Sequence, residues 1–427
     1  MSNAIKGLRA YLDRAHSVYH AVQILTRELD RAGYTCLQEQ DRWQLDPGGK
    51  YYVTRGGSAL AAFRVPEAAP KGFLMAAAHT DRPTFKLKEN PELTGKYTRL
   101  ATEKYGGMIL SSWMDRPLSL AGRVMVQTEK GIAAKLVDLD RDLLVIPSVA
   151  IHLNRKVNEG YAWNPAVDTL PLLGGEDTAG KLQGLLEEAA GGKVLGHDLY
   201  LYVRQESRLC GLNEEFITAP ALDDLMCAWC CTQGLLESQP TGSLPVLCLF
   251  DSEEVGSSSV QGACSDLLES ILQRICITCG WDMAQMLRHS FMLSADNAHA
   301  LHPNHPELSD GTNAPVVNGG VVLKFNANLR YATDGVAAAV LRTVCQRANV
   351  PVQTYYNRAD LPGGSTLGSI SLSHVAVPTA DIGLAQLAMH SACETAGVQD
   401  TNYLLDAMKT YFGCSLECTK DGEYTIK

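Results

Sequence analysis

The segment Gly72–Asp81 reads GFLMAAAHTD and places an apolar run directly before a histidine and an aspartate. A second apolar run, LPVLCLF at Leu244–Phe250, is followed at once by the acidic sequence DSEE. Apolar runs of this length, bounded by turn-forming residues, are typical of strands that are covered on both faces, as in an α/β sheet. Both segments therefore predict buried strands of one α/β fold, with polar side chains at the end of each strand.

Two kinds of pattern divide the chain. Before residue 90 and after Ala221, apolar strand-like runs alternate with helical patterns, which is typical of an α/β fold. Between about residues 90 and 220, short alternating runs such as GRVMVQT and DLYLYV are separated by connections rich in Gly and Pro, which indicates a β-rich unit. We therefore predict a discontinuous α/β domain over residues 1–89 and 218–427, interrupted by an inserted β-rich domain over residues 90–217.

Composition and charge narrow the classes of partner. The chain of 427 residues is 46% hydrophobic and 20% charged, an ordinary globular balance with material for a large core. Its formal net charge of −10 offers no basic surface for nucleic acid, so nucleic acid is not an expected partner. No apolar run approaches the ~20 residues that span a bilayer, so a membrane is not expected as a partner either.

The first helix and the cysteines both favour a cytoplasmic location. Apolar residues recur at helical spacing from Ile5 to Leu29 with charges between them, which predicts one amphipathic helix rather than a secretory signal. The 13 cysteines, an odd number scattered through apolar segments, are typical of reduced, buried thiols. Two CxxC pairs, beginning at Cys227 and Cys276, leave a cysteine zinc site open as an alternative, although they lack the Gly-rich context of zinc ribbons.

Acids and histidines repeatedly follow the apolar runs of the α/β part. In an open α/β sheet, ligands bind beyond the carboxyl ends of the strands, so these side chains are expected to converge on one crevice. A single histidine or a pair of aspartates after a strand is most often a structural residue or a helix cap, and each site alone indicates little. Five such sites in one chain indicate a shared function. The residues are His79, Asp81, Asp223, Asp224, Glu253, Glu254, Asp296 and His390.

This set has the composition of a hydrolase site with two metal ions. One carboxylate can bridge the ions, each ion takes one histidine and one further carboxylate, and one acid is left over as a base. A cation also makes adjacent glutamates tolerable in a buried position, because it neutralises the carboxylate that binds it. Consecutive residues that leave a strand point in different directions, so Glu253 and Glu254 can divide the roles of ligand and base.

Nine segments carry a family resemblance. They are AAAHTDRP, SSWMDRPLSLAGRV, IHLNRKVNEG, PALDDL, FDSEEVGS, SADNAHALHPNH, VLKFNANLRYATD, GGSTLGSI and AMHSACE. With these segments in this order, the chain resembles the aspartyl aminopeptidase family of dinuclear zinc metallo-aminopeptidases over nearly its whole length. The resemblance implies a three-layer, mixed-sheet metallopeptidase domain for the α/β part. It also implies a dimerisation role for the inserted β-rich domain.

The resemblance implies two divalent metal ions per subunit. Zinc is the ion of the family, and the affinity order of divalent metals for nitrogen and oxygen ligands favours it over cobalt and manganese, which stay open as alternatives. Carried over to the matching positions, the ligands would be Asp223 as the bridge, His79 with Asp296 at one ion, and Glu254 with His390 at the other.

Two further acids take catalytic roles by the same resemblance. Glu253 would be the general base that takes a proton from a water and passes it to the leaving amine, since zinc makes such a water more acidic. Asp81 lies two residues after His79 and would accept the second N–H of that imidazole, which fixes its tautomer.

The resemblance also implies residues that hold a peptide substrate. Lys324 and Tyr331 match the family region near the first side chain of the substrate, although an ordinary lysine at a strand edge is an equally good interpretation. Gly364 and Ser365 offer backbone N–H groups and a hydroxyl to the substrate backbone, or form a plain tight turn. His152, in the inserted domain, would reach the active site of a neighbouring subunit.

Three more histidines cluster in the segment HALHPNH. They are His299, His302 and His305, and they could suggest a third metal site. Pro303 breaks the helical spacing between them, so we expect them to line the pocket or to support the ligands rather than to bind a separate metal ion.

The predicted function is a cytoplasmic, metal-dependent aminopeptidase that removes N-terminal residues, with Asp or Glu preferred, from peptides. The resemblance implies a homo-oligomer, typically a dodecamer built from dimers. One alternative keeps the dinuclear site but changes the substrate, to neutral N-terminal residues or to the substrates of a deacylase or carboxypeptidase. Another is a non-catalytic peptide-binding scaffold, which the complete set of ligand positions disfavours.

Two positions depart from the family pattern. The family usually has Asn after the bridging aspartate, where this chain has Asp224. The family usually has Arg before the glutamate of AMHSACE, where this chain has Cys393. We expect neither side chain to touch a proposed ligand, so the prediction of a metal site stands, whereas the fine specificity of the site is left open.

Overall fold

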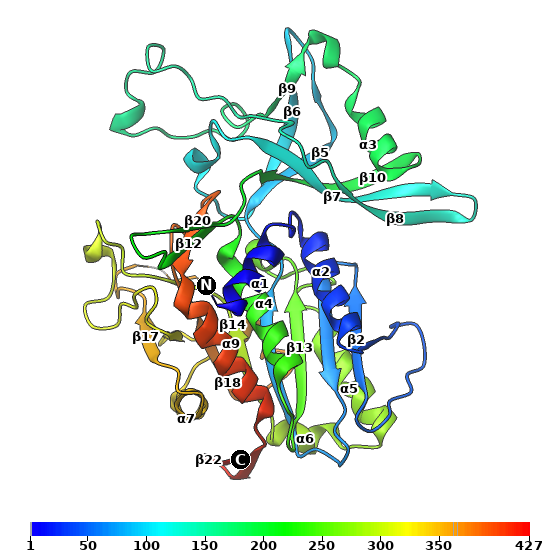
Figure 1. Ribbon diagram of the computed structural model, residues 1–427, viewed down its shortest axis with the longest axis vertical. Coiled ribbons are helices and arrows are strands. Elements are labelled where there is room, and N and C mark those ends of the chain that lie inside the picture. The colour runs from blue at the N-terminus through cyan, green and yellow to red at the C-terminus, as the bar shows by residue number, and fades with distance from the viewer. Residues whose placement is uncertain (1, 362, 365) are drawn as a thin grey trace.

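The computed structural model describes residues 2–361, 363–364 and 366–427. A broad sheet with helices on both faces forms the lower part of the molecule in Figure 1, and a smaller β-rich part lies above it. This arrangement confirms the predicted fold, an α/β part of three layers joined to a second part that is rich in strands.

The main sheet is mixed, with a parallel centre. Its strands, in spatial order, are β1 (Thr35–Cys36), β2 (Lys50–Arg55), β3 (Ala59–Arg64), β13 (Leu244–Phe250), β4 (Phe73–His79), β14 (Phe291–Ala295), β18 (Thr379–Gly383), β16 (Val321–Phe325) and β17 (Val352–Tyr356). The four strands from β13 to β18 run parallel to one another. β3 and β16 pair with this centre in the antiparallel direction.

Two apolar clusters, one on each face, hold the helices to the sheet. Along β4, Leu74 and Ala76 belong to one cluster, whereas Phe73 and Met75 belong to the other, because successive side chains of a strand point to opposite faces. This explains why the strand reads as a continuous apolar run. The first cluster packs α1 (Asn3–Leu12), α2 (Val18–Arg31), α4 (Leu222–Glu237), α7 (Gly335–Arg347) and α9 (Val398–Gly413); the second packs α5 (Leu267–Cys279), α6 (Met283–Arg288) and α8 (Leu367–Ser371).

The N-terminal segment forms two helices, α1 and α2, so the prediction of one helix from Ile5 to Leu29 was wrong. Ser17 lies before α2 in an extended conformation, and its side chain accepts a hydrogen bond from the backbone N–H of His20. A serine in this position caps a new helix, because it satisfies an N–H group that has no partner inside the helix. The local capping signal therefore overrides the continuous apolar spacing.

The β-rich part is built on a second sheet. Its strands, in spatial order, are β8 (Gly131–Asp138), β7 (Leu118–Thr128), β10 (Val194–Val203), β5 (Thr84–Leu93), β6 (Tyr97–Tyr105) and β9 (Leu172–Gly175). This sheet and α3 (Leu182–Ala190) enclose an apolar core of their own. The strands fall within residues 84–203, and the division into domains at residues 90 and 217 stays a prediction.

Shorter elements complete the fold. A third sheet joins β11 (Arg208–Cys210), β12 (Phe216–Ala219), β20 (Glu394–Gly397), β19 (Ala385–Leu387) and β15 (Ala298–His299), and a hairpin joins β21 (Leu416–Lys420) to β22 (Glu423–Ile426). Short 3-10 turns are η1 (Leu110–Trp113), η2 (Val157–Glu159), η3 (Glu176–Thr178), η4 (Glu253–Val255) and η5 (Pro306–Leu308). Across the described ranges, no helix has both the length and the apolar character needed to cross a membrane.

Candidate metal centre

The acids and histidines singled out in the sequence converge at the carboxyl ends of the central parallel strands. β13, β4 and β14 are neighbours in the sheet, so the residues that follow them meet at one edge. His79 ends β4, Asp296 follows β14 directly, and both glutamates of η4 come just after β13. The start of α4 contributes Asp223, and the loop between β19 and β20 contributes His390.

Asp223 lies between two histidines, with one carboxylate oxygen towards each. Its Oδ1 is 3.7 Å from Nε2 of His79, and its Oδ2 is 3.5 Å from Nε2 of His390. Oε2 of Glu254 is 3.4 Å from the same His390 nitrogen. Potential ligand atoms of His79, Asp223 and Asp296 lie within 4.8 Å of one another, and so do those of Asp223, Glu254 and His390. The five side chains thus form two groups that share Asp223.

The adjacent glutamates lie in a turn and not on an extended strand end, which corrects the strand-based reason for their different directions. They open the 3-10 turn η4, which follows Ser252 in the left-handed region at a φ of 65°. Glu254 belongs to the group with Asp223 and His390, and both glutamates form a further group with His79. The two carboxylates therefore share one site, separated by the geometry of a tight turn.

Asp81 contacts more than the histidine that it was predicted to orient. Its Oδ1 is 3.3 Å from Nδ1 of His79, and its backbone carbonyl oxygen is 3.1 Å from that nitrogen. The same carboxylate accepts the backbone N–H groups of Glu253 and Glu254, at 3.1 and 3.2 Å, and the hydroxyl of Tyr105, at 2.8 Å. One buried carboxylate therefore fixes both the imidazole and the turn that carries the two glutamates.

The site concentrates acidic groups in a buried position. Burial, together with the nearby acids Asp296 and Asp81, raises the pKa of Glu253 to about 8, although His79 opposes the shift. Burial also raises the pKa of Glu254 well above its ordinary value. Buried carboxylates are costly unless a cation or a set of hydrogen-bond donors compensates them. The cluster therefore calls for bound positive charge.

The donor atoms fit divalent metal ions. Imidazole nitrogens and carboxylate oxygens are the ligands of zinc in sites that keep a position open for water or substrate. Among the described residues, Oδ1 of Asp223 and Oε1 of Glu254 are buried without a hydrogen-bond partner. Buried polar atoms normally have such a partner, so unsatisfied oxygens on two carboxylates of this cluster are what metal ligation would explain.

One of the two departures from the family pattern does touch a ligand, contrary to expectation. Oδ2 of Asp224 accepts the backbone N–H of His79 at 3.1 Å, because the first turn of α4 packs against the end of β4. Cys393 contacts Gln205, whose Nε2 lies 3.1 Å from the cysteine sulfur. The side-chain oxygen of Gln205 in turn accepts a hydrogen bond from Arg116 at 2.9 Å, which brings a guanidinium near the position of the missing arginine.

Lys324 is buried beside the site, so the interpretation as an ordinary edge lysine was wrong. It lies in β16, between β17 and β18, and is 1% exposed. Its Nζ donates to the backbone oxygen of Asp296 at 2.7 Å and is 3.6 Å from Oδ1 of that residue. The ring centre of Tyr331 is 5.2 Å away. Burial opposes the positive charge, but Asp296 and Tyr331 raise the pKa of Lys324 above its ordinary value.

A cavity of about 310 Å³ opens next to the loop that carries His390. Its lining residues include His299, His302 and Arg358, together with Tyr355 and Met389. Two of the three histidines of HALHPNH therefore line a cavity, although none of the five proposed ligands lines it, and the third histidine is exposed and pairs with a glutamate. Their role at the metal site stays a prediction. Within the described part of the chain, no acidic side chain lines the cavity.

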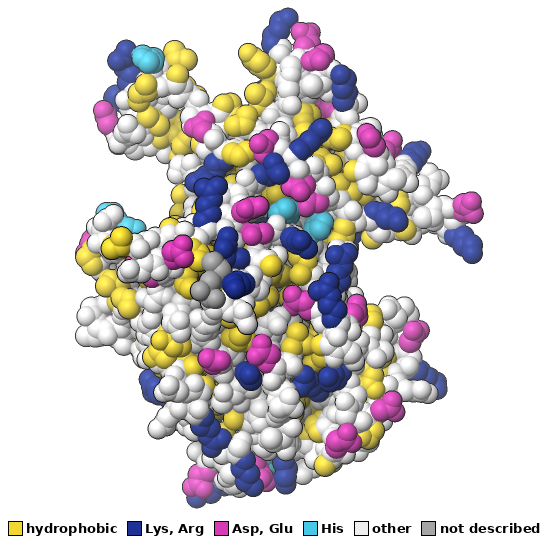
Figure 2. Space-filling view, viewed as in Figure 1, with side chains coloured by type: hydrophobic (Ala, Val, Ile, Leu, Met, Phe, Trp, Pro, Cys, Tyr) yellow, Lys and Arg dark blue, Asp and Glu magenta, His cyan; other side chains and the backbone are white. Residues whose placement is uncertain are grey.

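The structure does not place the other three predicted substrate-binding residues, His152, Gly364 and Ser365, at the metal centre. His152 is exposed on a long loop of the β-rich part, at the upper left of Figure 1. Hydrophobic side chains gather on that loop in Figure 2; the most exposed are Leu153 (83%) and Val167 (65%). Gly364 is exposed, and Ser365 falls outside the described residues.

Two polar residues that contact the site, the half-buried Tyr105 and the buried Glu394, were not foreseen. Tyr105, at the end of β6, donates its hydroxyl to Asp81. Glu394, at the start of β20, accepts the backbone N–H groups of Asp223 and His390. The strand of Tyr105 carries no polar motif, so no signal in the sequence pointed to it. Glu394 does lie in the segment AMHSACE, four residues after a predicted ligand, and its position there was the available signal.

Known proteins match the chain over nearly its full length. Residues 11–412 match the family described as Aminopeptidase I zinc metalloprotease (M18). A protein of Clostridium novyi named "Probable M18 family aminopeptidase 2" is 40% identical, with 96% of this chain and 100% of that protein covered.

Solved structures agree with this assignment. A chain in the cryo-EM structure of the Ape4 and Nbr1 complex is 35% identical with a TM-score of 0.92, covering 96% of this chain and 85% of that one. The mApe1 dodecamer of Saccharomyces cerevisiae is 26% identical with a TM-score of 0.85, covering 96% of both chains. Both the matched length and the sequence identity exceed what a shared fold alone would give. The chain therefore belongs to the M18 family of zinc metallo-aminopeptidases and is a metal-dependent hydrolase.

Proposed function

We propose that the chain removes acidic N-terminal residues from peptides with two divalent metal ions that share Asp223. The observation that carries the proposal is the position of that carboxylate between His79 and His390, with one oxygen towards each imidazole. Asp296 completes the ligand set on one side, and Glu254 completes it on the other. Zinc is the ion that the family description names.

The proposed chemistry assigns each side chain a separate task. When bound, a pair of divalent ions supplies Lewis acidity towards the scissile carbonyl and towards water. Glu253 lies beside the ligands but outside both groups that share Asp223, so its carboxylate is the one left to accept a proton from the attacking water and to deliver it to the leaving amine. Asp81 holds His79 and the turn of Glu253 in place.

The preference for acidic residues rests on the charge around the site. The cavity next to His390 presents His299, His302 and Arg358 without a facing acid among its described lining residues. Lys324 does not line this cavity; it lies next to the ring of Tyr331, which packs against Tyr355 of the cavity wall, and it pairs with Asp296. Arg358 also pairs with Asp360, at 2.8 Å, so the proposal requires a substrate carboxylate to join that pair; an apolar side chain would gain no such interaction.

The experiment for activity and metal content uses the purified protein and amides of single amino acids. We expect turnover of the Asp-amide to stop when a chelator removes the metal and to return with Zn²⁺, Co²⁺ or Mn²⁺. Elemental analysis of the active protein is expected to give two ions per chain. An active protein with one ion or none per chain would contradict the shared pair.

The same substrates test the specificity. We expect the Asp-amide to be preferred over the Leu-amide, and Lys324→Ala to reduce kcat/KM for the Asp-amide far more than for the Leu-amide. Lys324 also contacts Asp296, so metal content is measured in parallel. Equal losses on both substrates would remove Lys324 from specificity and leave it as a support for the ligand. A preference for the Leu-amide in the unaltered protein would favour the neutral-residue alternative.

We also propose that copies of this chain assemble, with His152 reaching the active site of another copy. The support is the exposed apolar loop around His152, which offers surface for a second chain and lies apart from the residues of its own site. A structural relative forms a dodecamer, and we propose the same closed assembly of dimers here. A cytoplasmic location remains a prediction from the sequence.

A further inference from the structure

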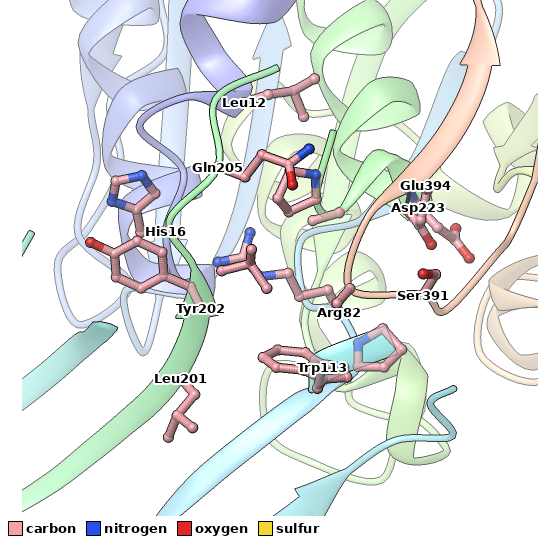
Figure 3. Close-up of a pocket in the computed structure, with 15 residues that line it drawn as sticks. Leu12, His16, Arg82, Trp113, Leu201, Tyr202, Gln205, Asp223, Ser391 and Glu394 are labelled. Atoms are coloured by element: carbon pink, nitrogen blue, oxygen red, sulfur yellow. Dashed lines mark hydrogen bonds between the residues drawn. The ribbon is translucent and has the colours of Figure 1, made fainter. Parts of the chain in front are cut away.

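The carboxylate of Glu394 connects two of the proposed ligands through their backbone. Its Oε2 accepts the N–H of Asp223 at 3.0 Å, and its Oε1 accepts the N–H of His390 at 2.7 Å. Figure 3 shows Glu394 beside Asp223, where β20 passes the start of α4. Glu394 is 1% exposed, so water cannot replace either of these bonds.

The backbone of His390 needs such a support. His390 has a φ of 65°, in the left-handed region that side chains other than glycine rarely adopt. A residue in this conformation persists where its surroundings hold it. Glu394 binds its N–H from one side, and the N–H of Ile109 donates to its carbonyl oxygen at 3.0 Å from the other. The direction of the imidazole therefore depends on these two bonds.

A chain of buried amides continues from Glu394 to the remaining side of the site. Nε2 of Gln386 lies 3.4 Å from Oε1 of Glu394, and Oε1 of Gln386 accepts a hydrogen bond from Asn297 at 2.8 Å. Asn297 also donates to the backbone oxygen of Leu222 at 3.0 Å. Asn297 and Leu222 are the direct neighbours in sequence of the ligands Asp296 and Asp223. The network thus connects the carboxylate of Glu394 to the segments that carry Asp223, His390 and Asp296.

We propose that Glu394 is a positioning residue that sets the spacing between Asp223 and His390, and hence the affinity of the metal site formed by Asp223, Glu254 and His390. A carboxylate can serve both N–H groups because each of its oxygens is an acceptor, whereas an amide has one acceptor and one donor. The ion on the side of His79 and Asp296 depends less on Glu394, because of its three ligands only the shared Asp223 contacts that carboxylate. This inference rests on the proposed pair of metal ions.

The experiment measures metal affinity rather than turnover. The metal-free protein is titrated with Zn²⁺ in competition with a chromophoric chelator, for the unaltered chain and for Glu394→Gln. We expect the unaltered chain to bind two ions, and the substitution to weaken one of them by roughly 10–100-fold, the usual effect of losing a partner behind a ligand. The affinity of the other ion, which shares Asp223, is expected to fall by less.

Asp400 supplies a matched control. Its carboxylate is fully buried and accepts two backbone N–H groups, those of Asn318 at 2.6 Å and Gly320 at 2.9 Å, but it contacts no proposed ligand. Asp400→Asn therefore removes the same kind of interaction in the adjoining helix α9, and both zinc affinities are expected to be unchanged. An equal loss in Asp400→Asn and Glu394→Gln would overturn the proposal, because the effect would then be general destabilisation.

Two further variants show which metal ion is affected and provide a substitute if Glu394→Gln does not fold. If Glu394 acts through His390, Glu394→Gln costs less affinity in a His390→Ala background than in the unaltered chain, because coupled residues are not additive. Should Glu394→Gln fail to fold, Gln386→Met removes the donor behind Glu394 and is expected to weaken the same ion to a smaller extent. Unchanged affinity for both ions in whichever variant folds would overturn the proposal. If the unaltered chain binds a single ion, the proposed pair of metal ions is wrong. The titration of the unaltered chain shows this before any variant is measured.

Discussion

Glu253 and Glu254 are neighbours in one turn, yet the proposal gives them different tasks. Glu253→Gln should keep two metal ions, and its kcat should be roughly 10²–10⁴-fold lower, because an amide of the same shape cannot accept a proton. Glu254→Gln is the matched comparison, and it should lower the metal content as well. Steady-state kinetics with the Asp-amide and elemental analysis on the same samples would separate the two. A wild-type kcat in Glu253→Gln would remove this residue from the mechanism.

The sequence indicated which acids and histidines meet, but not how they are held. The five proposed ligands follow apolar runs or open a helix, and such positions are visible in a sequence because strand ends converge in an α/β sheet. The bonds from Asp81 to the N–H groups of Glu253 and Glu254, and from Glu394 to those of Asp223 and His390, involve the backbone. Every residue except proline has a backbone N–H, so the residue type does not reveal which N–H groups a carboxylate will accept.

At the level of elements, the apolar pattern located the strands more reliably than the helix ends. β4 and β13 occupy the runs that predicted them. The break between α1 and α2 was missed because the apolar residues keep their phase across it, from Ala15 to Val22, which is two helical turns. Ser17 was the signal, since serine before an apolar helical pattern is a common cap.

Helix α2 carries a histidine that should make the fold sensitive to acid. Burial lowers the pKa of His20 to about 4, and the neighbouring Asp138 opposes the shift only in part. A histidine whose pKa is lower in the folded chain contributes stability above its unfolded pKa of about 6.5, and that contribution is lost progressively as the pH falls from about 6.5 to about 4. Between pH 7.5 and pH 5 the loss is roughly 2 kcal/mol.

His20→Gln should therefore lose less stability than the unaltered chain over this range. The measurement is urea unfolding at pH 7.5 and pH 5, compared between the two proteins so that any shared effect of metal release cancels. His305→Gln, at an exposed histidine, serves as the control and should follow the unaltered chain. The same loss in all three proteins would show that His20 is not the group that titrates.

For the whole molecule, the β-rich part raises the question of assembly. If His152 works in another copy, His152→Ala and Glu253→Gln chains should complement each other. In a mixed dimer, one site has an intact Glu253 and receives an intact His152, whereas the other site has neither. Random pairing makes half of the dimers mixed, and half of their sites active, so about a quarter of wild-type activity should return.

The complementation needs proof that the subunits exchange. Differently tagged chains that co-purify after mixing would supply it, and each variant alone sets the baseline. Exchange without recovered activity would place His152 in the site of its own chain or in the packing of its loop.

The division of the chain into an α/β part and a β-rich part was predictable, whereas its limits at residues 90 and 217 stay a prediction. The change from α/β to β-rich patterns is a property of long segments and survives local errors. The second sheet begins in β5 at Thr84, only a few residues after the ligand His79, and no composition change marks that point. β12, which also pairs with β11, then returns to pair with β20 of the α/β part, a long-range contact that local patterns do not report.

The order in which the proposed ligands occur along the chain has a consequence for protein synthesis. His79 leaves the ribosome first and His390 last, with the whole β-rich part made between them. β13 must also insert between β3 and β4, which are translated long before it. If His390 is a ligand as proposed, a growing chain would lack part of its metal site until residue 390 has emerged, and a nascent or prematurely terminated product would be inert towards the peptides around it.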